Sequence, residues 1–111
     1  MAYDENAARR VRTILEAREG VREVRMMGGL IFMVNGHMCC GVHDRSLMIR
    51  VGADRREEFL RHPHVGPLDI GRGRQPKAFL RVEPAGFEAD DALTKWIGHA
   101  LDFVGTLPPK P

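Results

Sequence analysis

The amino-acid sequence predicts an α+β fold of two layers, in which an antiparallel meander sheet carries helices packed on one face. Apolar residues recur at helical spacing near both ends of the chain, over residues 4–18 and 90–104. Between these segments lie short apolar runs joined by short connections, which is typical of antiparallel neighbours. The expected order is one helix, three or four strands, a second helix, one or two strands and a last helix, in short α-β-β-β-α-β-β-α.

Length and composition favour a single small domain. The chain has 111 residues, of which 43% are hydrophobic and 29% are charged, with a net charge of +2. We expect one domain over residues 1–107 and a frayed proline-rich tail at 108–111. No apolar run approaches the ~20 residues of a membrane span, and no secretory signal is visible at the N-terminus. The expected location is the cytoplasm, without a membrane partner.

The first helix is expected over residues 4–18. Asp4 can cap it, and its apolar stripe includes Ala7, Val11 and Leu15. Gly20 occupies the position of a left-handed residue beyond the helix end. Residues 21–27 then have the pattern of a strand.

A hairpin is expected at the centre of the sheet. Residues 30–34 and 37–42 are apolar runs separated by Asn35-Gly36, and this dipeptide is the strongest short-range hairpin signal because both residues accept positive φ. A two-residue loop sets the register of the two strands. The expected pairs are Val34 with His37, Met33 with Met38, Phe32 with Cys39, and Ile31 with Cys40.

The remaining elements follow from alternation and turn residues. Residues 46–51 form a third hairpin partner, and Asp54 has the spacing of a cap for a short helix that stops at His62-Pro63. Residues 63–76 form the loosest stretch, with room for a short strand at 68–70. Residues 77–83 form a clear strand. The last helix, near 90–104, has the buried stripe Leu93, Trp96, Ile97, Ala100, Leu101 and Val104.

The central hairpin is apolar on both faces, although helices are expected to cover only one. Such a sheet normally alternates apolar with polar residues. One face offers Leu30, Phe32, Val34 and Cys39, and the other offers Ile31, Met33, Met38, Cys40 and Val42. The second face therefore needs a cover, which is either the loop at 63–76 or a second copy of the chain. We expect Ile31, Met33, Met38 and Cys40 to contact a partner, either in a homodimer or in a complex with another protein.

A basic surface is a second candidate site. Arg25, Arg50, Lys77 and Arg81 lie opposite core-facing neighbours in alternating strands, with Phe79 among them. If these strands are adjacent, they form a platform of charge and stacking that suits single-stranded nucleic acid. Arg72 and Arg74 add a mobile anion contact in the loop. An ordinary solvated face is the competing interpretation, and nucleic acid is the less favoured partner.

The sequence carries no recognisable catalytic motif, so no enzyme activity and no cofactor are expected. His37 and Cys39 are weak metal candidates, because zinc needs three or four converging ligands and no CxxC pair or HExxH helix is present. Cys39 and Cys40 are adjacent, and their sulfurs should point to opposite faces of a strand. We interpret both as small buried hydrophobic residues in a reducing compartment.

Several turn and core motifs occur together in the chain. They are Met1-Ala2-Tyr3-Asp4-Glu5, Met26-Met27-Gly28-Gly29-Leu30, Phe32-Met33-Val34-Asn35-Gly36, Met38-Cys39-Cys40-Gly41-Val42, Leu47-Met48-Ile49-Arg50-Val51-Gly52, Pro84-Ala85-Gly86 and Leu107-Pro108-Pro109-Lys110. With them, almost the whole chain resembles the N-terminal domain of TfoX/Sxy-type competence regulators, in its stand-alone form. The family's usual Met-Phe-Gly-Gly appears here as Met26-Met27-Gly28-Gly29.

The resemblance implies a fold similar to that of type III secretion chaperones, and it supplies no catalytic residues to transfer. Full-length competence regulators carry a second, helix-hairpin-helix-like domain, which this 111-residue sequence does not include. The expected function is therefore a non-enzymatic cytoplasmic interaction or regulatory module. A weak nucleic-acid binder is the alternative, and a metal- or thiol-dependent enzyme that uses His37, Cys39 or Cys40 is the least favoured one.

Overall fold

The computed structural model describes residues 3–26 and 28–110, and over these residues it forms a six-stranded antiparallel sheet with helices. The predicted α+β class and order of elements are confirmed, with four strands before the second helix. Met27, expected at the end of the first strand, lies outside the described residues. The elements are α1 (Glu5–Leu15), β1 (Val21–Met26), β2 (Gly29–Val34), β3 (His37–His43), β4 (Ser46–Arg50), α2 (Arg56–Leu60), β5 (Val65–Pro67), β6 (Phe79–Val82), the 3-10 turn η1 (Pro84–Gly86) and α3 (Asp90–Val104).

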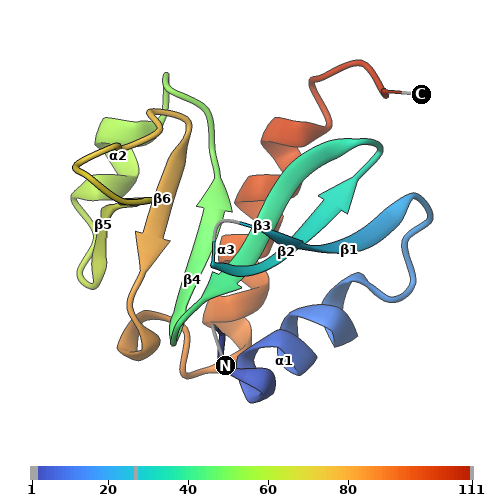
Figure 1. The fold of residues 1–111 in the computed structure, drawn as a ribbon, viewed down its shortest axis with the longest axis horizontal. Helices are drawn as coiled ribbons and strands as arrows, with labels where there is room; N and C mark the ends of the chain where they lie inside the picture. The colour runs from blue at the N-terminus through green and yellow to red at the C-terminus, as the bar shows by residue number, and fades with distance from the viewer. Residues whose placement is uncertain (1–2, 27, 111) are drawn as a thin grey trace.

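The strands lie in the order β1-β2-β3-β4-β6-β5, so the first four form the predicted meander (Figure 1). β6 pairs with β4, and β5 lies outside β6 at the edge of the sheet. The chain between β5 and β6, residues 68–78, is called here the covering loop. Helix α3 lies behind the sheet in Figure 1, and the face toward the viewer carries no helix.

One large apolar core fills the space between the sheet and the helices. Asp4 caps α1, because its Oδ1 accepts a hydrogen bond from the backbone N–H of Asn6 at 2.9 Å. The predicted stripes of α1 and α3 pack into this core, with Leu101 of α3 only partly buried. Phe59 of α2 packs into the same core, together with Leu47, Ile49, Leu80 and Val82 from the sheet.

Several local predictions differ from the structure. The strand expected over residues 77–83 spans only Phe79–Val82, because residues 77–78 form a turn. The first helix ends at Leu15 rather than at residue 18. Asp54 does not cap α2, which begins at Arg56 after an N-cap residue whose side chain forms no capping bond. The short strand after α2 lies at Val65–Pro67 rather than at 68–70. It lies there because Val65 pairs with Val82 and buries its side chain against the core, whereas Leu68 turns to the opposite face of the sheet.

The central hairpin contains a β-bulge that changes the predicted register. Asn35 and Gly36 adopt φ of 52° and 84°, as the two-residue turn requires, and the two pairs nearest to it are as predicted. Beyond them, Phe32 pairs with Cys40, which leaves Cys39 as the extra residue. The predicted pairs of Phe32 with Cys39 and Ile31 with Cys40 are therefore wrong. Cys40 and Val42, expected on the open face, lie in the helix-side core, as does Cys39.

The C-terminal tail contacts the tip of this hairpin. The backbone N–H of Lys110 donates to the carbonyl oxygen of Asn35 at 2.9 Å. The ring Nε2 of His37 donates to the carbonyl oxygen of Pro108 at 2.6 Å. These two bonds join the tail to the hairpin tip, up to Lys110. Within the described residues, no helix is both long enough and apolar enough to cross a membrane.

Candidate protein-binding face

The sheet face opposite the helices carries a second apolar cluster. Ile31, Met48, Leu68 and Phe79 are buried in it, and Met33, Met38, Ile70 and Ala78 pack partly buried against it. Residues paired across antiparallel strands lie on the same face, so the pairing of Val24 with Ile31 also places Val24 and Met26 here. We call the set Met26, Ile31, Met33, Met38, Met48 and Phe79 the methionine face.

The covering loop supplies one of the two expected covers. Leu68 is only 2% exposed and packs into the cluster with Ile31, which is fully buried. The loop closes on itself next to this contact. The N–H of Ile70 donates to the carbonyl oxygen of Arg74 at 3.0 Å, and the N–H of Gly71 donates to Oδ1 of Asp69 at 2.8 Å. The loop thus shields one half of the methionine face within a single chain.

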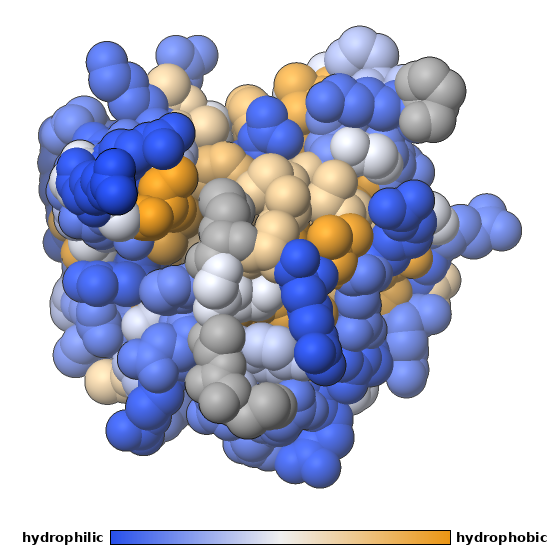
Figure 2. Space-filling model, in the orientation of Figure 1, coloured by the Kyte–Doolittle hydropathy of each residue, from blue (hydrophilic) through white to orange (hydrophobic). Residues whose placement is uncertain are grey.

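The other half of the methionine face stays open. Met33 and Met38 are only partly buried, and Met26 is 38% exposed. These three side chains belong to β1, β2 and β3, on the side of the sheet away from β6. Figure 2 shows a pale orange field near the centre of the face toward the viewer, with blue side chains around it. An apolar field at the centre of a sheet marks a candidate interaction surface.

Cations border the open methionines. Arg22 and Lys110 line a hollow of about 470 Å³ beside Met33, and none of the residues that line it is acidic. On the other side, Nη1 of Arg50 donates to the carbonyl oxygen of Met38 at 3.3 Å. The Arg50 guanidinium lies 5.7 Å from the ring centre of Phe79, which holds it against the face.

The basic residues predicted to form a nucleic-acid platform do not share one surface. Arg25 pairs with Leu30, so it lies on the helix side of β1, where its guanidinium is 6.0 Å from the Tyr3 ring. The expectation that it shares a surface with Arg50 and Arg81 is therefore wrong. Arg81 does lie on the open side and forms an ion pair with Glu83 at 2.9 Å. Phe79 is buried rather than presented for stacking.

Further cations lie on the covering loop and on the open face of β1. Arg72, Arg74 and Lys77 are exposed on the covering loop. Arg22 was absent from the predicted set, although it pairs with Met33 on the open face. Side chains alternate between the two faces of a strand, so Arg22 lies on the same face as Met26. The sequence does not show which face this is, because Val21 and Val24 are both apolar and lie on opposite faces of β1.

The thiols and His37 lie away from the methionine face. A hydrogen bond from Cys40 lowers the pKa of Cys39, while that bond and complete burial raise the pKa of Cys40 well above its ordinary value. His37 is buried, and its Nε2 is taken by Pro108. The described residues include no group of three or more His, Cys, Asp or Glu side chains placed to hold a metal ion.

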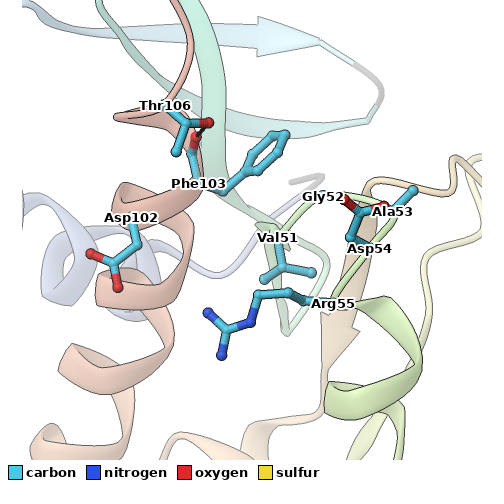
Figure 3. Close-up of a pocket in the computed structure, with 8 residues that line it drawn as sticks. All are labelled: Val51, Gly52, Ala53, Asp54, Arg55, Asp102, Phe103 and Thr106. Carbon is cyan, nitrogen blue, oxygen red and sulfur yellow. Dashed lines mark hydrogen bonds between the residues drawn. The ribbon is translucent and has the colours of Figure 1, made fainter.

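Two further hollows lie near α2 and α3. The first, about 460 Å³, is lined by the loop after β4 and the end of α3, and Figure 3 shows Arg55 reaching across it toward α3. Arg55 is already engaged by Glu58 at 3.2 Å and lies 4.5 Å from the centre of the Phe59 ring. The arrangement couples no nucleophile to a base, so it indicates local packing.

The second of these hollows, about 410 Å³, is lined by His62, Trp96 and His99 among others. Trp96 is fixed because its Nε1 donates to the carbonyl oxygen of Gly86 at 3.1 Å. Burial lowers the pKa of His99, whose ring stacks 4.7 Å from that of Phe59. The Phe59–Trp96–His99 contacts therefore join α2 to α3.

Comparison with known proteins gives one match. The family model described as the TfoX N-terminal domain matches residues 13–104, which is most of the chain. No curated protein and no solved structure shows a significant match.

Proposed function

The chain belongs to the TfoX N-terminal domain family, and on this premise we propose that it is a non-enzymatic interaction module, regulatory in role, that binds a partner protein through the methionine face. One observation carries the proposal. Met33 and Met38 remain partly exposed at the centre of the sheet even though Leu68 covers their neighbours.

The chemistry of the face supports binding rather than catalysis. Methionine side chains are unbranched and polarisable, so they adapt to the shape of an incoming surface. Full burial of an exposed apolar side chain contributes about 1.5–3 kcal/mol. A partner that covers Met26, Met33 and Met38 gains the part of this contribution that belongs to their still exposed surface. The family resemblance supplies no catalytic residues, which agrees with a binding role.

Site-specific photo-crosslinking in cells tests the proposal. A photo-reactive amino acid replaces Met38 in one variant and Thr94, which is exposed on α3, in the control. We expect discrete protein adducts from position 38 that position 94 does not give. The proposal fails if the two positions give the same adducts, or if position 38 gives none.

The exposed cations Arg72, Arg74 and Lys77 support nucleic-acid binding as a second candidate. Binding of this kind falls steeply with salt, because it releases counterions from the phosphates. Titration of labelled single- and double-stranded DNA and RNA at about 50 mM salt tests it, and undetectable binding there removes the candidate.

Self-association and a cytoplasmic location also remain proposals. Sedimentation at high protein concentration tests the first, and a homodimer would be broken by Met38→Glu if it uses the methionine face. Fractionation of the source cells tests the second, with the chain expected in the cytoplasmic fraction.

A further inference from the structure

We propose that the partner presents an acidic amphipathic helix to the methionine face, an inference that rests on the proposed function. The helix would place its apolar stripe on Met26, Met33 and Met38 and its carboxylates against the cations at the border. The proposal follows from the width of the open strip and from the charges around it.

The open strip has the width of one helix. The covering loop occupies the part of the face over Ile31, Met48 and Phe79, which leaves Met26 on β1, Met33 on β2 and Met38 on β3 partly exposed. Neighbouring strands lie about 4.8 Å apart, so two spacings give a strip of roughly 10 Å. An α-helix with its side chains is about 10–12 Å across. A helix with apolar residues at i, i+3, i+4 and i+7 presents a stripe that fits such a floor.

The border of the strip is positive at both sides. Arg22 and Lys110 line the hollow beside Met33, Arg50 donates to the carbonyl oxygen of Met38, and the exposed Arg72, Arg74 and Lys77 lie on the covering loop. Within the described part of the chain Arg22 forms no ion pair, which leaves it free for a carboxylate.

The covering loop carries more cations than carboxylates. It holds Arg72, Arg74 and Lys77 against one carboxylate, Asp69, whose Oδ1 accepts the N–H of Gly71, while Glu83 on the neighbouring strand is paired with Arg81. The charge that a partner would meet on this face is therefore positive, and a helix with Asp and Glu beside its apolar stripe complements it.

The same charges disfavour a second copy of the chain. A two-fold dimer through this face would bring one basic border against another, and like charges across an interface are costly. Nucleic acid suits the border but not the centre, because the floor is aliphatic and thioether rather than aromatic, and Phe79 is buried. An acidic amphipathic helix would cover the apolar centre with its apolar stripe and pair its carboxylates with the cations at the border.

Selection from a displayed library of helical peptides tests the inference on the folded chain. We expect the enriched peptides to carry an apolar stripe flanked by Asp and Glu, and their binding to weaken as salt rises. Enrichment of neutral or basic peptides, or no enrichment, overturns the inference. Binding of the labelled DNA or RNA that is lost in the Met38→Glu variant overturns it as well, because nucleic acid would then occupy the face.

A matched pair of charge reversals locates the binding site. Arg22 and Arg25 are both exposed on β1, but Arg22 lies on the open face and Arg25 on the helix side. Arg22→Glu should weaken the selected peptide about tenfold, whereas Arg25→Glu should leave its affinity within about twofold. Equal losses in the two variants would contradict the assignment.

The two proposals fail separately. Adducts from position 38 combined with non-acidic peptides would leave the interaction module standing and remove only the acidic helix. Absence of adducts from position 38 would remove the interaction module itself. Sedimentation that shows a dimer disrupted by Met38→Glu would mean that a second copy of the chain binds the methionine face. This result would overturn the proposal of an acidic helix.

Discussion

Cys39 and Cys40 show how a single extra residue redirects its neighbours. The bulge leaves Cys39 unpaired against β2 and turns both side chains into the helix-side core. Because a thiol reacts as the thiolate, burial and the raised pKa of Cys40 make it inert in the folded chain.

Thiol reactivity gives a prediction for both residues. In the folded chain, both cysteines should react slowly with an aromatic disulfide reagent, and in urea both should react at the rate of a free thiol. The absorbance of the released thiolate measures the rates. A rapid phase of one thiol per native chain would contradict the assigned burial.

Gly52 is a position where the backbone requires glycine. It has φ of +83°, and an added Cβ would lie 2.5 Å from Cε1 of Phe103. Gly52→Ala should therefore combine backbone strain with a clash and lower the free energy of unfolding by about 2 kcal/mol or more. The control is Gly73→Ala, with φ of +72° and no atom within 4 Å, which should cost only the strain, about 1 kcal/mol. Urea unfolding compares the two, and equal losses would count against the clash.

The Arg12–Glu23 pair gives a pH-dependent prediction. Nε and Nη2 of Arg12 donate to the two oxygens of Glu23 at 2.6 and 2.8 Å, and this bonding lowers the pKa of Glu23. A lowered pKa stabilises the fold above the carboxyl's unfolded value and loses that contribution as pH falls through the folded value. Glu23→Gln should cost less than about 1 kcal/mol near neutral pH, because the pair is partly exposed.

Urea unfolding of wild type and Glu23→Gln at several pH values measures this difference. It should shrink as pH falls below about 4, where the carboxyl is protonated in the unfolded chain and then in the folded one. A difference that grows toward acid pH would contradict the pairing.

Among the elements, the covering loop makes the most consequential contact. It buries Leu68 against Ile31, Met48 and Phe79, on a face that otherwise meets water. Leu68→Ala should lower the free energy of unfolding by about 2–4 kcal/mol and raise the binding of a hydrophobic dye by the folded chain. Ile70→Ala, at a partly buried site of the same loop, is the control and should cost less. An unchanged stability and dye signal in Leu68→Ala would show that the loop does not cover the face.

The elements also differ in how far the sequence predicts them. The bounds of α3 and the turn at Asn35-Gly36 were predictable, because one depends on a helical stripe and the other on two residues that accept positive φ. The bulge was not, since Cys39 and Cys40 are both small and apolar and either register buries them. The prediction that Asp54 caps α2 is wrong, because burial of Phe59 rather than a capping hydrogen bond fixes the position of this short helix.

For the whole molecule, the sequence predicted that the sheet would be apolar on both faces, but it left the cover open. The structure assigns part of the cover to Leu68 and leaves Met33 and Met38 partly exposed. Strand order, and the face of β1 on which each side chain lies, determine which cations border these methionines. That is why Arg22 was missed and Arg25 was placed on the wrong face.

The central claim is that the uncovered half of the methionine face is the surface to which a partner binds. The most direct measurement is methyl NMR of the methionine-labelled chain during addition of the selected acidic helical peptide. We predict that the methyl signals of Met26, Met33 and Met38 shift together, and that Arg22→Glu suppresses the shifts while Arg25→Glu does not. Methionine signals that stay unmoved while the peptide is bound would contradict the account.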